Sequence, residues 1–249
     1  MQYKYVKEQA DYSDLASGRV FHSLPGHPAF PVRLASEIFQ RCMAHRQTIY
    51  KNSTRSVLYD PCCGAAYHLS VLTYLHRENI QETIGSDVEE KAVALAKRNL
   101  ELVSIAGLDN RIAEISAMSD RYGKSSHTDA LRSAQIMRSH SLALAQKYPV
   151  MAKVFHANAT EGKEIFNNIR ANSVDIVFTD VPYGQHSAWD SSKAIDPIAT
   201  MLDVLTNILS GSSIVAIASD KQQKVSHEKY RRIEQFQIGK RRVVIMKLI

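Results

Sequence analysis

One stretch near the start of the chain, residues 57–66 (VLYDPCCGAA), constrains the fold more than any other. A short apolar run ends in Asp60, breaks into Pro61 and small residues, and continues into the helix-like segment 67–75. This pattern is typical of a strand, a tight loop and a helix at the carboxyl edge of a parallel sheet. Because α/β sheets bind ligands at that edge, we expect a binding site there.

A second acid follows at the spacing that nucleotide-binding folds use. Asp87 ends the segment 83–87, twenty-three positions after Gly64, and a carboxylate at a second strand end can accept hydrogen bonds from both hydroxyls of a ribose. The loop has Ala65 after Gly64, and it lacks the Gly-x-Gly-x-x-Gly pattern that lets a backbone approach a pyrophosphate. We therefore expect a nucleoside cofactor without phosphates, which disfavours a nicotinamide oxidoreductase.

Composition bounds the class of protein. The 249 residues are 45% hydrophobic, which is enough for one well-buried core, and we interpret 1–249 as a single domain. The net charge of +6 suits a polyanionic partner without requiring one. The three cysteines, Cys42, Cys62 and Cys63, include two neighbours that are poorly placed for a disulfide, so reduced thiols in a cytoplasmic protein are expected. Neither a zinc-type spacing nor an apolar run of membrane-spanning length is present, so we expect no metal and no membrane.

The periodicity of apolar residues predicts alternating strands and helices. Residues 1–46 form a turn-rich lead-in and a helix that begins at Pro31, and residues 119–153 form a helical insertion within the domain. Two β-rich segments within 234–249 suggest a terminal hairpin. The other expected helices are 89–102, 161–170 and 201–209, and the other expected strands are 151–156, 174–179 and 213–218. These intervals predict an α/β, doubly wound sheet.

The segment after the strand 174–179 carries the most informative short motif, Asp180, Val181, Pro182, Tyr183 and Gly184. An amino group on a flat base is recognised by hydrogen-bond acceptors and by stacking, because its lone pair is delocalised into the ring. The Asp180 carboxylate and the Val181 carbonyl can accept, Pro182 restricts the loop, and Tyr183 offers a stacking face. The motif therefore predicts a site for an amino group on a base.

These segments resemble the S-adenosylmethionine-dependent methyltransferases that modify amino groups, and among them the AviRa family of avilamycin-resistance methyltransferases. The resemblance rests on 22–41, 59–64, 86–88 and 179–184, together with Trp189, and it extends over about residues 13–242. It implies a Rossmann-like methyltransferase sheet, mostly parallel with a C-terminal antiparallel hairpin. It also implies an enzyme that methylates a guanine of large-subunit (23S) ribosomal RNA, possible resistance to orthosomycins such as avilamycin, and a monomer.

The resemblance also assigns roles to individual residues. The methionine end of S-adenosylmethionine would be lined by Asp60, Cys62, Gly64, Ala65 and Tyr67, the ribose by Asp87 and Val88, and the adenine by Asn158 and Ala159. Position 158 is Asn where many methyltransferases have Asp, and an Asn carbonyl can still accept from the adenine amino group. Residues 180–183 would carry out catalysis on the guanine. RNA contacts are expected from Tyr183, Gly184, His186, Trp189, Lys240, Arg241 and Arg242.

Two segments are basic enough to suggest contacts with RNA phosphates. The insertion 119–153 has six Lys or Arg against two acids, and the tail 221–249 has nine against two. Solvated faces are often charged, but phosphate contacts that fix register without reading sequence suit an RNA enzyme. The expected reaction is direct transfer of the sulfonium methyl group to the guanine 2-amino group. The alternatives are an amino-methyltransferase acting on adenine or on protein glutamine, and an RNA-binding module without catalysis.

Overall fold

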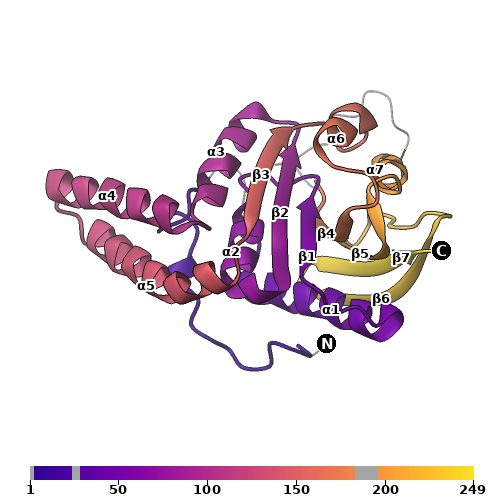
Figure 1. The fold of residues 1–249 in the computed structure, drawn as a ribbon, viewed down its shortest axis with the longest axis horizontal. Coiled ribbons are helices and arrows are strands. Elements are labelled where there is room, and N and C mark those ends of the chain that lie inside the picture. The colour runs from indigo at the N-terminus through magenta and orange to yellow at the C-terminus, as the bar shows by residue number, and fades with distance from the viewer. Residues whose placement is uncertain (1–2, 24–28, 183–195) are drawn as a thin grey trace.

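The computed structural model describes residues 3–23, 29–182 and 196–249, in which seven strands form one sheet (Figure 1). The strand order is β3-β2-β1-β4-β5-β7-β6, with β1 to β5 parallel and β7 antiparallel to both of its neighbours. The strands are β1 (Ser56–Asp60), β2 (Ile80–Asp87), β3 (Met151–His156), β4 (Val174–Asp180), β5 (Leu209–Asp220), β6 (Tyr230–Ile238) and β7 (Arg241–Leu248). The expected doubly wound sheet with a C-terminal antiparallel hairpin is confirmed.

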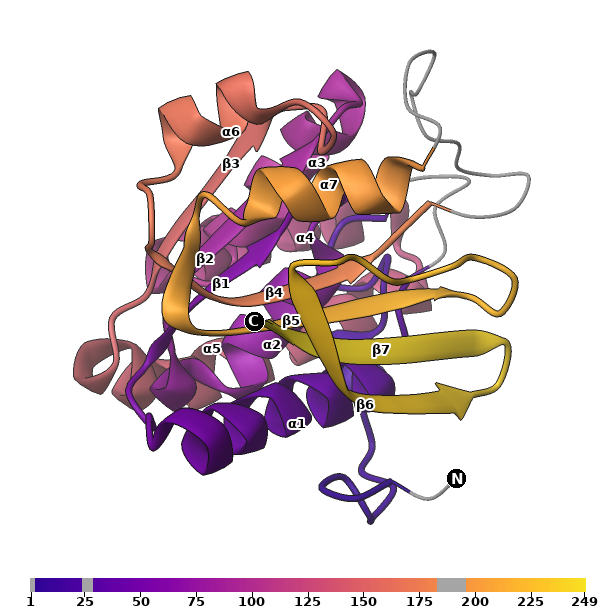
Figure 2. The same cartoon turned by 90° about the vertical axis from the view of Figure 1, so that its right-hand side faces the viewer.

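Helices cover both faces of this sheet (Figure 2). One face packs against α1 (Val32–Tyr50), α2 (Tyr67–Leu75) and α3 (Glu90–Glu101), and the other packs against α6 (Gly162–Asn168) and α7 (Pro197–Leu205). Successive side chains of a strand point to opposite faces of the sheet, and in β1 Leu58 packs in the core cluster on one face and Tyr59 in the cluster on the other. Strands buried on both faces explain the continuous apolar runs in the sequence.

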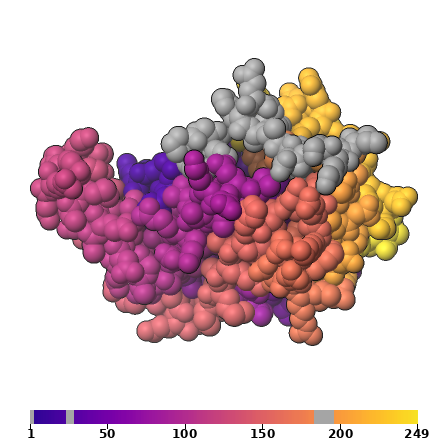
Figure 3. Space-filling model, turned by 90° about the horizontal axis from the view of Figure 1, so that it is seen from above, coloured from indigo at the N-terminus to yellow at the C-terminus, as the bar shows by residue number. Residues whose placement is uncertain are grey.

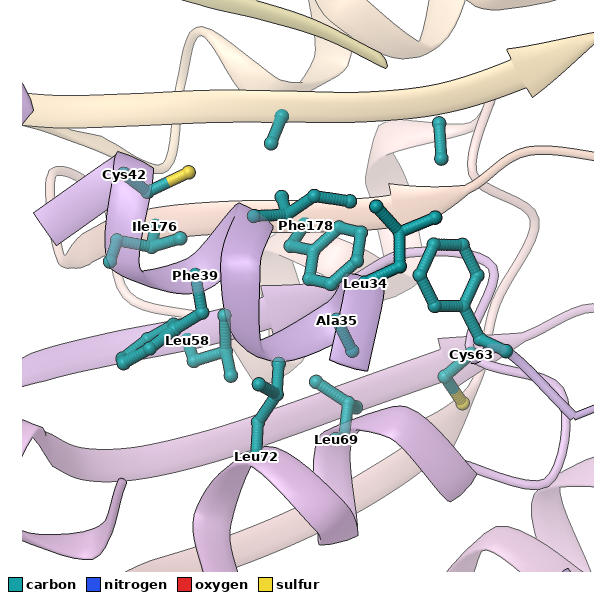
Figure 4. Packing of buried hydrophobic residues seen from close by; sticks show 14 of the residues in the cluster. Leu34, Ala35, Phe39, Cys42, Leu58, Cys63, Leu69, Leu72, Ile176 and Phe178 are labelled. Carbon is teal, nitrogen blue, oxygen red and sulfur yellow. The ribbon is translucent and has the colours of Figure 1, made fainter. Parts of the chain in front are cut away.

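The loop after β1 is anchored in the first of these clusters. Figure 4 shows Cys63 beside Leu34 of α1, Leu69 of α2 and Phe178 of β4. A Cβ atom on Gly85 of β2 would lie 2.9 Å from the Cys63 sulfur, so only glycine lets the loop pack this closely on the second strand. The loop is therefore held by the core and not only by its own turns.

The helical insertion is longer than its pattern predicts. Two antiparallel helices, α4 (Ile105–Tyr122) and α5 (Ser125–Lys147), form a hairpin that projects from the body (Figure 1). We expected the insertion to start at 119, but α4 begins with the Ser104 side chain accepting a hydrogen bond from the Gly107 amide. A polar surface hides the apolar periodicity of α4, in which only Leu108 and Ile115 are buried.

Other elements also have bounds that differ from the expected ones, and β2, β5 and β6 begin at Ile80, Leu209 and Tyr230, three or four residues earlier than expected. The first helix continues to Tyr50, and Pro31 is its N-cap residue and not its first helical residue. The last helix starts at Pro197, where the Asp196 side chain accepts from the Ala199 amide, and it ends at Leu205. The expected range 201–209 was wrong because apolar spacing continues past the helix into the start of β5.

Candidate active site

Three acids that the sequence singled out end three neighbouring strands. Asp60 ends β1, Asp87 ends β2 and Asp180 ends β4, and these strands are adjacent in the order β2-β1-β4. Carboxyl ends of parallel strands meet at one edge, so the fold brings the three carboxylates to the same side of the sheet. Figure 3 looks down on this side of the molecule.

The loop between β1 and α2 is shaped by hydrogen bonds to two of these acids. Asp60 Oδ1 accepts from the Cys62 amide at 3.0 Å, and Asp87 Oδ2 accepts from the Gly64 amide at 2.7 Å. Gly64 and Ala66 both have positive φ angles, 51° and 52°. The left-handed conformation is easily reached by glycine, and it turns the chain sharply before α2 begins. The two strand-end acids therefore fix the loop that is expected to hold the cofactor.

Asp60 has a second, buried partner on α2. Its Oδ2 atom lies 3.0 Å from Nε2 of His68, and both side chains are almost fully buried. The His68 ring packs against Phe30 and Phe178, with ring centroids 5.8 and 4.9 Å away, and those two rings also contact each other. Burial alone lowers the pKa of His68, but Asp60, Asp180 and a hydrogen bond to the Phe178 backbone outweigh it, so the pKa of His68 is raised.

Asp180 is held in an unusual electrostatic state. Burial raises the pKa of its carboxyl group to about 6, although Arg241 and His68 act in the opposite direction. Arg241 Nη2 lies 3.6 Å from Asp180 Oδ2, and its guanidinium also lies over the Phe30 ring. Asp180 Oδ1 is buried and has no hydrogen-bond partner among the described residues. An acceptor oxygen of this kind could receive an N–H group from a bound base.

Hydrogen bonds to β5 and to the segment that follows it hold the two residues after β4, Val181 and Pro182. The Val181 amide donates to the Ala218 carbonyl at 3.0 Å, and the Val181 side chain is buried. The Pro182 carbonyl accepts from Gln223 Nε2 at 2.9 Å, while Gln223 Oε1 accepts from the Asp220 amide. The expected site residues Tyr183, Gly184, His186 and Trp189 lie outside the described residues.

Asp87 and its neighbours offer what a nucleoside requires. Asp87 Oδ1 accepts from the Glu89 amide at 3.0 Å, in addition to the bond from Gly64 to its other oxygen. Its carboxylate is half-buried, and Val88 beside it is exposed. The Val88 carbonyl accepts from His156 Nε2, which joins the ends of β2 and β3. Each carboxylate oxygen has a second lone pair, so the residues present fit a ribose diol.

Three residues that were expected to bind the cofactor are engaged or buried within the protein itself. Asn158 Oδ1 accepts from both the amide and the hydroxyl of Thr160, at 3.0 and 2.8 Å, so the oxygen that we expected to take the adenine amino group is already used. Ala159 is buried in the second core cluster. The Tyr67 hydroxyl donates to the Leu15 carbonyl at 2.6 Å and its ring packs edge-on against Phe21. Tyr67 thus anchors the N-terminal segment.

Cys62 and Cys63 pack on opposite faces of the sheet, Cys63 in the first core cluster and Cys62 against the second. Both thiols are free, and burial together with the neighbouring carboxylates of Asp60 and Asp87 raises their pKa values well above the usual range. A protonated thiol is a poor nucleophile. The free thiols agree with the reduced state expected from the sequence.

The three basic residues expected to contact RNA separate into two kinds. Lys240 is exposed at the turn between β6 and β7. Arg241 and Arg242 are half-buried, and Arg241 faces Asp180. In the other basic segment, Arg132, Arg138 and Lys153 each form an ion pair with a carboxylate. Half of the six cations of the insertion are therefore paired with acids, and its contact with RNA phosphates stays a prediction.

Sequence reasoning missed three residues that shape this edge: His68, Gln223 and Asn99. Asn99 of α3 is fully buried, and its Nδ2 donates to the carbonyls of Ala65 and His22 at 2.8 and 3.0 Å, while its Oδ1 accepts from the His22 amide. It thus ties the N-terminal segment to the loop after β1. These three residues contact parts of the chain that lie outside their own helix or turn, so the spacing of nearby residues in the sequence does not predict their contacts.

A family model described as rRNA methyltransferase AviRa matches residues 1–241. A 23S rRNA (guanine(2535)-N(1))-methyltransferase of Streptomyces viridochromogenes is 36% identical over 245 residues, which cover 98% of this chain and 95% of that protein. Two structures of the rRNA methyltransferase aviRa from the same organism superpose with TM-scores of 0.86 and 0.87 at 35% identity, covering 98% of this chain and 96% of theirs. TrmN from Thermus thermophilus shares the fold at 11% identity, with a TM-score of 0.51, over 88% of this chain and 49% of its own.

The described part of the chain has no helix both long and apolar enough to cross a membrane. It also contains no group of three or more His, Cys, Asp or Glu side chains arranged to hold a metal ion. The family match, the relative and the structures confirm the expectation of an RNA methyltransferase. The chain belongs to the AviRa family of rRNA methyltransferases.

Proposed function

We propose that this enzyme uses S-adenosylmethionine to methylate N1 of a guanine in 23S ribosomal RNA. The choice of N1 follows the relative, whose name specifies a guanine N(1), and it replaces the 2-amino group that the motif at Asp180 suggested. Both groups lie on the same edge of guanine, so an acceptor that faces this edge can serve either. The difference between them is chemical, because the N1 lone pair becomes available only when its proton leaves.

The residues that would hold the cofactor are those at the ends of β1 and β2. The loop 60–66 would hold the methionine portion, and Asp87 with Val88 would hold the ribose. When bound, S-adenosylmethionine supplies a methyl group already activated on a sulfonium. The protein's part is then mainly to position the base and to deal with its proton.

Asp180 is the proposed acceptor of the N1 proton. Its carboxyl pKa of about 6 keeps it mostly ionised at neutral pH while making it more basic than an ordinary aspartate. The proton would pass from N1 to the Asp180 carboxylate as the nitrogen forms its bond to the methyl carbon and the bond from that carbon to the sulfonium breaks. The products would be neutral 1-methylguanine, S-adenosylhomocysteine and a protonated Asp180, which returns its proton to water.

The single observation that carries this proposal is the buried Oδ1 of Asp180 at the carboxyl edge of β4, which has no hydrogen-bond partner within 3–23, 29–182 and 196–249. A buried acceptor without a partner costs free energy, on the order of 1–3 kcal/mol. Such a cost is commonly retained where a ligand supplies the missing hydrogen bond. The cluster of Asp60, His68 and Arg241 around Asp180 supports an electrostatic role for this group.

The proposal is tested by methyl transfer from labelled S-adenosylmethionine to 23S rRNA from cells that lack the gene. Wild-type enzyme should label the RNA, and digestion to nucleosides should yield labelled 1-methylguanosine. Asp180→Asn should bind the cofactor normally and give at least a hundredfold less label, since general-base catalysis contributes roughly 10²–10⁴-fold. Labelled N2-methylguanosine would move the reaction to the 2-amino group. Label in DNA or protein alone would refute an RNA substrate.

Resistance to avilamycin is a further part of the proposal, and it rests on the family resemblance. A methyl group on N1 removes a hydrogen-bond donor from a base, which would weaken binding of a drug that contacts that base. Ribosomal RNA as substrate would place the enzyme in the cytoplasm. Deletion should lower the avilamycin concentration that inhibits growth, and overexpression should raise it. Unchanged sensitivity in both strains would remove the resistance role.

A further inference from the structure

A cavity of about 620 Å³ lies where the N-terminal segment, α3 and the helical hairpin meet. Its lining includes Arg19, Arg98, Arg111 and Glu114, with the rings of His22 and His127. None of these residues belongs to the proposed catalytic site. His22 begins one of the segments that carry the family resemblance, and His127 lies in the basic insertion, but the arginines and Glu114 were not expected to form a site. The arginines come from three separate parts of the chain and meet only in the folded protein.

The cavity carries an excess of positive charge. Glu114 is shared by two guanidinium groups, with Arg111 Nη1 at 2.9 Å and Arg98 Nη2 at 3.3 Å. Arg19 Nη1 donates to the neutral hydroxyl of Ser133 at 3.4 Å. Within the lining itself, one carboxylate therefore faces three arginines. Two acids lie near Arg19 outside the lining, because the Ser133 hydroxyl donates to Asp14 Oδ1 at 2.6 Å and Arg19 contributes to the lowered pKa of Asp11. Burial and the positive charges of Arg111 and Arg98 lower the pKa of His22 to about 4, so this ring adds no positive charge at neutral pH.

The wall of the cavity is firmly built on one side. Arg111 Nε donates to the Val20 carbonyl at 2.9 Å, and its side chain is only 10% exposed. The Arg98 and Glu114 side chains are half-exposed. Because one guanidinium is held in place and another can adjust, the cavity can grip an anion without a large ordering cost.

The cavity is also joined to the proposed active site. His22 lies in the wall of the cavity, and its backbone makes two hydrogen bonds to the Asn99 side chain. The Asn99 side chain also donates to the Ala65 carbonyl in the loop after β1. In Figure 3 the hairpin and the N-terminal segment lie on the face that also carries the carboxyl edge of the sheet. A ligand long enough to reach both would be held at two points.

We propose that this cavity binds a backbone phosphate of the ribosomal RNA substrate, at a distance from the guanine that is methylated. The inference rests on the proposed RNA substrate and adds a second contact to it. Guanidinium groups bind phosphate oxygens through paired N–H donors, and such contacts fix the register of a nucleic acid without reading its sequence. An RNA chain anchored here would be restricted in how it presents its guanine to Asp180.

The test measures the affinity for transcribed 23S rRNA, without cofactor, over a series of salt concentrations. Arg98→Gln should raise Kd roughly three- to tenfold and lower the slope of log Kd against log salt by about 1. Glu114→Gln removes the one acid of the lining and should tighten binding. Arg132→Gln, on α5 outside the cavity with a 73% exposed side chain, is the matched control and should leave Kd unchanged. Thermal unfolding checks that each variant is folded.

Two results would overturn the proposal. One is equal weakening by Arg98→Gln and Arg132→Gln, which would indicate a diffuse basic surface. The other is an Arg98→Gln variant that keeps its affinity for RNA but binds inorganic phosphate more weakly in calorimetry, which would indicate a site for a free small anion. Failure of the proposed function is distinguishable, because the identity of the methylated nucleoside is measured separately from RNA binding.

Discussion

Asp60 Oδ2 and His68 Nε2 lie 3.0 Å apart in a buried ion pair at the carboxyl edge of the sheet. The pair joins the end of β1 to the start of α2, on either side of the loop expected to hold the cofactor. His68 also acts on Asp180, where its charge lowers the pKa of the carboxyl group. The pair therefore connects the stability of the loop to the proton affinity of the proposed catalytic group.

Replacing His68 by Gln should destabilise the fold, because it leaves the Asp60 carboxylate buried without its counter-charge. A loss of about 3–5 kcal/mol is expected when one partner of a buried pair is removed. The folded pKa of His68 is raised, so its stabilising contribution is fully present below the ordinary histidine value of 6.5 and is lost as pH rises through the folded pKa. Urea unfolding at pH 6 and pH 9 should show a larger deficit at pH 6. His140→Gln, at an exposed position, is the control.

Replacing Asp180 by Asn should abolish methyl transfer and stabilise the protein at neutral pH. Folding raises the Asp180 pKa from 3.8 to about 6, so the stability that this group contributes at low pH is lost as pH rises through about 6. The uncharged amide avoids this loss, which is on the order of 1–3 kcal/mol. A thermal unfolding midpoint at pH 7.5 no higher than that of the wild type would contradict the buried, disfavoured carboxylate.

The rate of methyl transfer should fall as pH decreases below about 6, because protonated Asp180 cannot accept a proton. Arg241 lies 3.6 Å from this carboxylate and lowers its pKa. Arg241→Gln should therefore move the acid side of the pH–rate profile to higher pH. Arg231→Gln, an exposed residue of β6, should leave the profile in place. An unmoved profile in Arg241→Gln would show that another group controls it.

Replacing Asp87 by Asn should weaken binding of S-adenosylmethionine by roughly 10–100-fold, because hydrogen bonds to a charged acceptor contribute about 1.5–3 kcal/mol. Asn retains one acceptor oxygen, so part of the hydrogen bonding to the loop can remain. Asp203→Asn on α7, whose carboxylate pairs with Lys229, is the control. Calorimetric titration measures both affinities. Equal affinity in wild type and Asp87→Asn would place the ribose elsewhere.

The fold also depends on a buried cation far from the site. Arg46 of α1 is fully buried and donates to Asp175 Oδ1 at 3.0 Å, and Asp175 Oδ2 accepts from the Val57 amide at the start of the sheet. Arg46→Met should lower the free energy of unfolding by about 3–5 kcal/mol. Cofactor affinity of the folded variant should be unchanged. A loss below 1 kcal/mol would mean that water replaces the pair.

The sequence predicted those parts of the fold that local pattern determines. The segment 67–75 is α2, and the strand 151–156 is β3, because apolar spacing and flanking turn residues mark both. Hairpin strands around Gly239 also appear, with a positive φ angle of 59° at that glycine. The start of α7 was missed although Asp196 and Pro197 form a recognisable helix start, since the apolar run beyond them dominated the interpretation.

The parts of the site that escaped prediction depend on contacts between distant segments. Nothing near Gln223 in the sequence indicates that its side chain would bind the Pro182 carbonyl, and nothing near Asn99 indicates that it would hold the Ala65 carbonyl. The bonds from Thr160 to Asn158 are instead local, because an Asn side chain commonly accepts from the backbone two residues further on. Arg19 also lies far along the chain from Arg98 and Arg111, yet all three share one cavity. The count of charges along the sequence identified the insertion as basic, although several of its cations are paired with acids. The same count did not identify the arginines that line the cavity.

The most direct test of the central claim is reverse transcription of 23S rRNA from cells with and without the gene. A methyl group on N1 blocks Watson–Crick pairing, so extension should stop at one guanine in the presence of the gene and read through in its absence. Complementation with wild-type enzyme should restore the stop, and Asp180→Asn should not. Identical extension in all strains would contradict N1 methylation of 23S rRNA by this enzyme.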